Sequence, residues 1–148
     1  TYGALFVLQP AFVSSAGALG GILASRLATA FQVGTLDPDA VPGRGSRQLA
    51  SVVLVLALPV SLYNAVGSQI TAALVGKSSP GLLSLLAVSA LASAVVMAFV
   101  VSVAYYSTVV ATRVGLDPDN YGTPVVTSSV DFVGALALII VVLLLGVV

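Results

Sequence analysis

The stretch G-L-L-S-L-L-A-V-S-A-L-A-S-A-V-V-M-A-F-V-V-S-V-A-Y-Y-S-T-V-V-A, from Gly81 to Ala111, decides the fold class because it carries no charged residue. The hydrocarbon core of a bilayer needs about 20 mostly apolar residues in a helix. Backbone groups in lipid have no water to bond, so such a segment must be helical. The stretch therefore predicts a helix that crosses a membrane.

Three further segments have the same character, and the only charges within them are Arg26 and Asp131. Connections that contain proline, glycine and charged residues separate the four segments, as expected for loops. The sequence thus predicts an all-α, polytopic transmembrane bundle that forms a single integral membrane domain over residues 1–148. The three further spans are expected at about 3–33, 49–75 and 123–148.

The composition supports a membrane protein and excludes several other classes. Of the 148 residues, 59% are hydrophobic and 7% are charged, and the mean hydropathy is +1.16. A soluble domain carries about 25% charged residues, and a nucleic-acid binder needs a basic patch, whereas the net charge here is zero. We expect membrane lipid, and no nucleic acid, around this chain.

Two residue types that carry much enzyme chemistry are missing. The chain has no cysteine and no histidine, which removes thiolate nucleophiles, most zinc sites and Ser-His catalysis. We therefore expect no catalytic residue and no enzyme.

The basic residues predict an orientation in the membrane. The first and third connections, residues 35–47 and 113–122, lie on one side, and the opposite side has only Lys77. Because lysine and arginine favour the cytoplasmic side, we expect both connections to be cytoplasmic. The basic residues of that side are Arg26, Arg44, Arg47 and Arg113. We expect the membrane to be the cell (plasma) membrane.

Asp131 is the residue that most needs an explanation. At about 1.5 Å per residue from position 123, it lies roughly 12 Å inside a hydrocarbon core about 30 Å thick. A carboxylate there costs several kcal/mol, and intramembrane carboxylates usually mark transport routes. The alternative is that Asp131 is protonated, or that it hydrogen-bonds a neighbouring helix.

The helical neighbours of Asp131 favour an ion pathway. Oxygen-only sites suit hard cations, and Mg²⁺ keeps much of its water shell, so one or two carboxylates are enough. A two-fold pairing of chains would place two Asp131 carboxylates on one axis. The face of small and polar residues around Asp131 consists of Thr123, Pro124, Thr127, Ser128, Gly134 and Ala135.

Other polar residues are weaker candidates. Asn64 shares a helical face with Ser68 and Thr71. That arrangement favours hydrogen-bonded helix packing, with pore lining as the second interpretation.

The tripeptide D-P-D occurs twice in the presumed cytoplasmic loops, at Asp37–Asp39 and Asp117–Asp119. Each favours a simple Asp-Pro turn. Together the two copies are also a candidate for an acidic vestibule that concentrates cations, with Asp117, Asp119 and Asn120 as its candidate residues.

Two motifs resemble a known family. A-S-R-L-A-T-A (Ala24–Ala30) is similar to the second membrane helix of MgtE-type magnesium transporters and is closest to their eukaryotic solute-carrier relatives. D-P-D-N-Y-G-T-P-V-V-T-S-S-V-D-F-V-G (Asp117–Gly134) resembles the last helix of the family. The resemblance implies a bundle of five helices, of which the first is absent from this chain, and a pore shared by two such bundles.

The resemblance also implies functional residues. The pore aspartate of the family corresponds to Asp131, and its pore-lining glycine-rich stretch corresponds to Ser14–Gly21, which includes Ser15 and Gly17. The expected function is a divalent cation channel or transporter that carries Mg²⁺, with a homodimer or a second similar half-transporter as partner. Two alternatives stay open: a proton-coupled permease for another solute, and a membrane subunit that does not transport.

Overall fold

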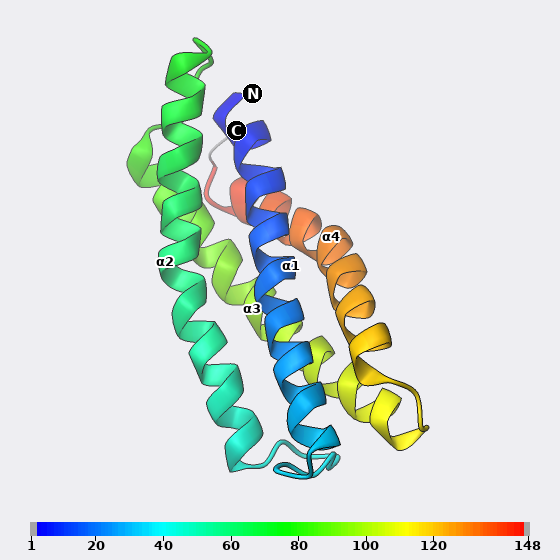
Figure 1. The fold of residues 1–148 in the computed structure, drawn as a ribbon. Coiled ribbons are helices and arrows are strands. Elements are labelled where there is room, and N and C mark those ends of the chain that lie inside the picture. Colours follow the sequence, from blue (N-terminus) through cyan, green and yellow to red (C-terminus); the bar gives the residue numbers. More distant parts are fainter. Residues whose placement is uncertain (1–2, 147–148) are drawn as a thin grey trace.

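The structure is a computed structural model, describes residues 3–146, and contains within that range four α-helices and no strand, which confirms the all-α prediction. All four are long and apolar enough to cross a membrane. Successive helices run in opposite directions, so the start of α1 and the end of α4 lie at the same end of the bundle (Figure 1). The helices are α1 (Gly3–Gln32), α2 (Arg44–Leu74), α3 (Leu82–Arg113) and α4 (Pro118–Leu144).

Helices α1 and α3 each contact the three other helices of the described part. Helices α2 and α4 make no contact with each other across the described residues. Figure 1 shows α1 between α2 and α4, with α3 behind. A side chain on α1 can therefore face one of these two outer helices but not both.

Two helices begin earlier than the apolar pattern indicates. Helix α2 begins at Arg44 and α4 at Pro118, before the expected starts at 49 and 123. At α4 the Asp117 carboxylate accepts a hydrogen bond from the backbone N–H of Asp119 at 3.1 Å, which is a helix N-cap. Polar first turns therefore lie outside the apolar runs. Helix α4 ends at Leu144, and residues 147–148 of the expected span lie outside the described part.

Small residues allow α1 to approach its neighbours closely. A Cβ atom added at Gly20 would lie 2.5 Å from the Cγ1 atoms of both Val100 and Val126. The side chains of Val100 in α3 and Val126 in α4 therefore pack directly against the backbone of α1 at this point. Close backbone approach through small residues is the usual mode of helix packing in membranes.

Candidate ion pathway

The contact between α1 and α4 fixes how the residues of the expected polar face are arranged. A Cβ atom at Gly17 would lie 3.7 Å from Cγ2 of Thr127, and one at Gly21 would lie 3.3 Å from Cγ2 of Thr123. The methyl groups of both threonines thus point at glycines of α1. Gly134, further along α4, faces Val13 in the same way, at 3.4 Å.

The predicted polar face of α4 is therefore divided into two parts. Thr123, Thr127 and Gly134 are turned toward α1, as the preceding contacts show. Ser128 and Asp131 are exposed on the surface of the bundle. The exposed part places a carboxylate on the membrane-embedded surface of the single chain.

Ser14 of α1 lies at the same level as Asp131. Gly17 and Val13 of α1 contact Thr127 and Gly134 of α4, respectively. Ser14 lies between Val13 and Gly17 in α1, and Asp131 lies between Thr127 and Gly134 in the antiparallel helix α4. Ser14 is exposed like Asp131, so each helix contributes one exposed oxygen-bearing residue at this depth.

The hydroxyl groups near Asp131 are oriented as acceptors. Thr127 Oγ1 lies 3.1 Å from the carbonyl oxygen of Thr123 and 3.2 Å from that of Pro124, so its one hydrogen is donated to its own helix. Ser129 likewise donates to the carbonyl of Val125 at 2.6 Å. The oxygen lone pairs that remain can accept hydrogen bonds from water.

Ser15 and Asn64 belong to a different contact. The Nδ2 atom of Asn64 donates to Ser15 Oγ at 3.0 Å and to the carbonyl of Ala11 at 3.4 Å. Asn64 is buried between α1 and α2. Because α2 does not reach α4, the structure does not bring these two candidates together with Asp131, and the contact is of the helix-packing kind.

The second D-P-D forms the start of α4 and connects it to α1. Asp117 accepts hydrogen bonds from Asn120 Nδ2 at 2.8 Å and from Gln32 Nε2 at 3.4 Å. The carboxylate of Asp119 accepts from the hydroxyl of Ser25 at 3.2 Å. Asp117 is thus a capping residue, as the turn interpretation expects, while the carboxylates of both aspartates remain exposed.

The first D-P-D is anchored to α3 at the same end of the bundle (Figure 1). The Nε of Arg113 donates to the carbonyl of Pro38 at 2.7 Å, and the hydroxyl of Tyr105 donates to the carbonyl of Asp39 at 2.9 Å. These bonds engage the backbone of the turn and leave both carboxylates exposed. All four loop aspartates therefore lie at one end of the molecule.

Comparison with known proteins identifies the family. Residues 9–141 match the family MgtE, which is described as a divalent cation transporter. The chain belongs to the MgtE family of divalent cation transporters. No curated protein and no solved structure is significantly similar to it.

Membership of the MgtE family settles the general class of the protein. It is a transporter and not an enzyme, and its four candidate spans make it an integral membrane protein. The match extends from α1 to α4 and includes both Ser14 and Asp131.

In this MgtE-family chain the sequence pattern did not separate Ser14 from Ser15. The two adjacent serines point toward different surroundings, and only the positions of α2 and α4 around α1 distinguish them. Gly21 and Gly134 were within the expected stretches, but the sequence did not predict that they face Thr123 and Val13. The spacing Gly17-x-x-x-Gly21 was a signal for close packing, but it did not name the helix that packs there.

Proposed function

We propose that the chain conducts Mg²⁺ along the exposed face of α4 that carries Asp131. The observation that carries this proposal is the exposure of a carboxylate on a membrane-spanning helix. Contact between that carboxylate and lipid costs several kcal/mol, so membrane carboxylates face a water-filled path or a polar partner. A hydrated cation passing beside Asp131 satisfies that requirement.

The donor set favours an ion that keeps its water. Within residues 3–146 there is no group of three or more acidic, histidine or cysteine residues that could hold a metal ion. Mg²⁺ loses water reluctantly and is bound through one or two carboxylates plus water. In this account Asp131 supplies the charge, and Ser14, Thr127 and Ser128 accept hydrogen bonds from the water shell.

A second bundle completes the pathway. Asp131 and Ser14 lie on the surface of the single chain, so another bundle must cover them to exclude lipid. A two-fold axis beside α1 and α4 places two Asp131 carboxylates around one ion. We therefore propose a homodimer or a second, similar half-transporter as the partner.

The orientation of the pathway follows from the loops. The excess of arginine at the end of the bundle with both D-P-D loops supports a cytoplasmic position for that end. The membrane in this proposal is the plasma membrane. Asp117 and Asp119 then stand at the cytoplasmic end of α4, where their charge raises the local concentration of cations.

The proposal is tested by flux through the purified chain in liposomes that contain a Mg²⁺-sensitive dye. We expect Mg²⁺ entry down its own gradient at equal pH on both sides, and none in liposomes without protein. Flux that follows an imposed pH gradient instead of the Mg²⁺ gradient would indicate the proton-coupled permease. Absence of any flux would indicate the non-transporting subunit, and either result contradicts the proposal.

A further inference from the structure

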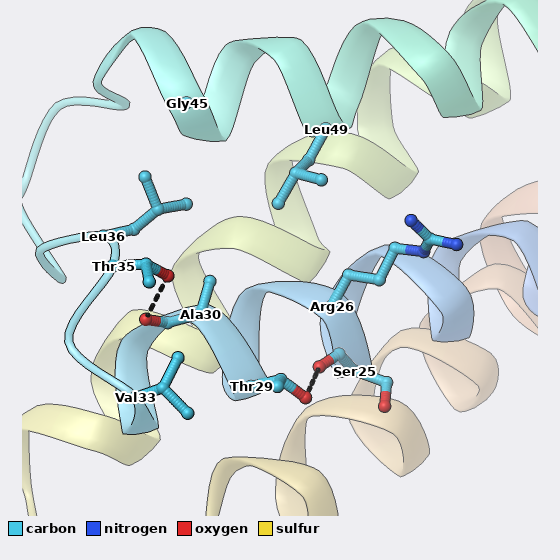
Figure 2. A pocket seen from close by; sticks show the side chains of 9 residues that line it. All are labelled: Ser25, Arg26, Thr29, Ala30, Val33, Thr35, Leu36, Gly45 and Leu49. Atoms are coloured by element: carbon cyan, nitrogen blue, oxygen red, sulfur yellow. Dashed lines mark hydrogen bonds between the residues drawn. The ribbon is translucent and has the colours of Figure 1, made fainter.

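A second polar feature lies away from the Asp131 face, between the end of α1 and the start of α2. A cleft of about 490 Å³ opens there. Figure 2 shows α1 and the following loop on one side of the cleft and the first turns of α2 on the other. It is lined by Ser25, Arg26, Thr29, Ala30, Val33, Thr35, Leu36, Gly45 and Leu49.

Arg26 is the only charged residue among the nine that line the cleft, and it is exposed. Its side chain extends from α1 toward α2, on the side away from the connecting loop (Figure 2). A guanidinium carries five N–H donors and no acceptor. The cleft is therefore suited to an anion.

The hydroxyl groups of the cleft already donate within the chain. Ser25 donates to Asp119 at 3.2 Å, Thr29 to the carbonyl of Ser25 at 3.0 Å, and Thr35 to the carbonyl of Ala30 at 3.1 Å. Arg26 is consequently the main donor for a ligand. The carboxylate of Asp119 accepts the hydrogen bond from Ser25, and Asp119 is not one of the residues that line the cleft.

The remaining lining residues are apolar, and an exposed apolar surface of α2 follows them. Leu36 and Leu49 form walls of the cleft. From Leu49 the same face of α2 continues through Val52 and Leu56, which are 55% and 46% exposed. A molecule with an anionic head and a hydrocarbon tail fits this sequence of surfaces, whereas a soluble anion uses only the arginine.

We propose that the cleft between α1 and α2 binds an anionic phospholipid, with its phosphate on Arg26 and an acyl chain along Val52 and Leu56, which lie further along α2 than Leu49. Basic pockets between membrane helices commonly bind lipid head groups. Each arginine near an anionic lipid surface contributes measurably to the free energy of binding. Arginine also bonds phosphate in a bidentate manner, which lysine does not.

The test is native mass spectrometry of the full chain, released from micelles that contain equal amounts of phosphatidylglycerol and phosphatidylcholine. We expect the parent to retain phosphatidylglycerol preferentially. Arg26→Gln should lower that retention about fivefold, which is what one arginine contact with anionic lipid provides. Arg44→Gln is the matched control, because Arg44 lies at the same end of the bundle but does not line the cleft.

A second pair of variants keeps the test independent of the loss of Arg26. Thr29→Asp places a carboxylate three positions after Arg26 on the same helix, where it pairs with the guanidinium. It should lower lipid retention, while the neutral Thr29→Asn should not.

Four results would overturn the proposal. One is equal retention by the parent and Arg26→Gln, and another is an equal loss in Arg44→Gln. A third is displacement of the lipid by millimolar inorganic phosphate, which would identify a soluble anion as the ligand. The fourth is a parent that retains no phosphatidylglycerol, as expected if a second copy covers the cleft.

Discussion

Asp131 and Asn64 are both polar residues of membrane-spanning helices, but the structure gives them opposite surroundings. Asn64 is buried and its amide donates to Ser15 and to the backbone of Ala11. Asp131 is exposed and lies level with Ser14. The first arrangement holds two helices together, and the second requires something outside the single chain.

Asn64→Ala should reduce stability and leave transport intact. Hydrogen bonds between membrane helices contribute about 0.6 kcal/mol on average and up to about 2. We expect the free energy of unfolding in detergent to fall by about that amount, with the Mg²⁺ flux per folded protein unchanged. Ser102→Ala is the control, because Ser102 is exposed and bonds only its own helix at Ala98. Loss of flux by a variant of normal stability would mean that Asn64 lines the pore.

The residue scale also shows where sequence reasoning stops. The position of Asp131 within the last apolar run was readable from the sequence, and so was the small, polar character of its neighbours. The division of those neighbours into two parts was not readable. Thr127 and Ser128 are adjacent in sequence, but only Thr127 faces Gly17. That distinction depends on the rotation of α4 about its axis, which tertiary packing sets.

Among the glycines that face another helix, Gly20 of α1 has the least room, against Val100 of α3 and Val126 of α4. Its hypothetical Cβ lies 2.5 Å from two valine methyl groups, whereas that of Gly17 lies 3.7 Å from its nearest neighbour. Valine is stiff at χ1, so neither methyl group can move aside easily. The two glycines thus differ in how much room each has for a side chain.

Gly20→Ala should destabilise the bundle, and Gly17→Ala should not. Inserting a methyl group into a well-packed core costs about 1–3 kcal/mol. We expect thermal unfolding of Gly20→Ala in detergent to occur several degrees lower than that of the parent and of Gly17→Ala. Equal melting of the two variants would mean that α1 does not approach α3 and α4 as closely as described.

The start of α4 offers a second prediction at the scale of the helix. Asp117 caps the first turn, and replacing such a cap by alanine costs about 0.5–2 kcal/mol. Asp117→Ala should therefore lower the free energy of unfolding, while Asp117→Ser, which keeps a capping oxygen, should restore most of it. If both variants lose the same amount, charge and not capping is what Asp117 contributes.

The four helices themselves were predictable, because long apolar runs in lipid have few other solutions. Their starts were harder to predict. The apolar pattern begins after the first turns of α2 and α4, which are polar. The Asp117-Pro118 pair was a visible start signal, but the hydropathy of the segment outweighed it.

For the whole molecule, the partner of the exposed α1–α4 face matters most. Periodicity in one sequence cannot distinguish a face that meets lipid from one that meets another bundle, except where a charge such as Asp131 makes lipid costly. The order of the helices around α1 was also not predictable, since small residues occur on most of its sides.

Cysteine cross-linking tests whether two copies meet at this face. The chain has no cysteine of its own, so any disulfide between two copies must form through the introduced cysteine. Ser128→Cys should form a disulfide-linked dimer on mild oxidation in membranes. Val55→Cys, on α2 and 73% exposed, should stay monomeric. Cross-linking of the α2 variant alone would place the interface elsewhere.

The central claim is that Asp131 carries the transported ion, and Mg²⁺ flux into proteoliposomes tests it most directly. Asp131→Ala should abolish flux, while Asp39→Ala, which removes an exposed loop carboxylate, should change it only modestly. Folding of each variant is checked by its melting temperature, so that a loss of flux is not a loss of protein. Flux through folded Asp131→Ala equal to that of the parent would contradict the account.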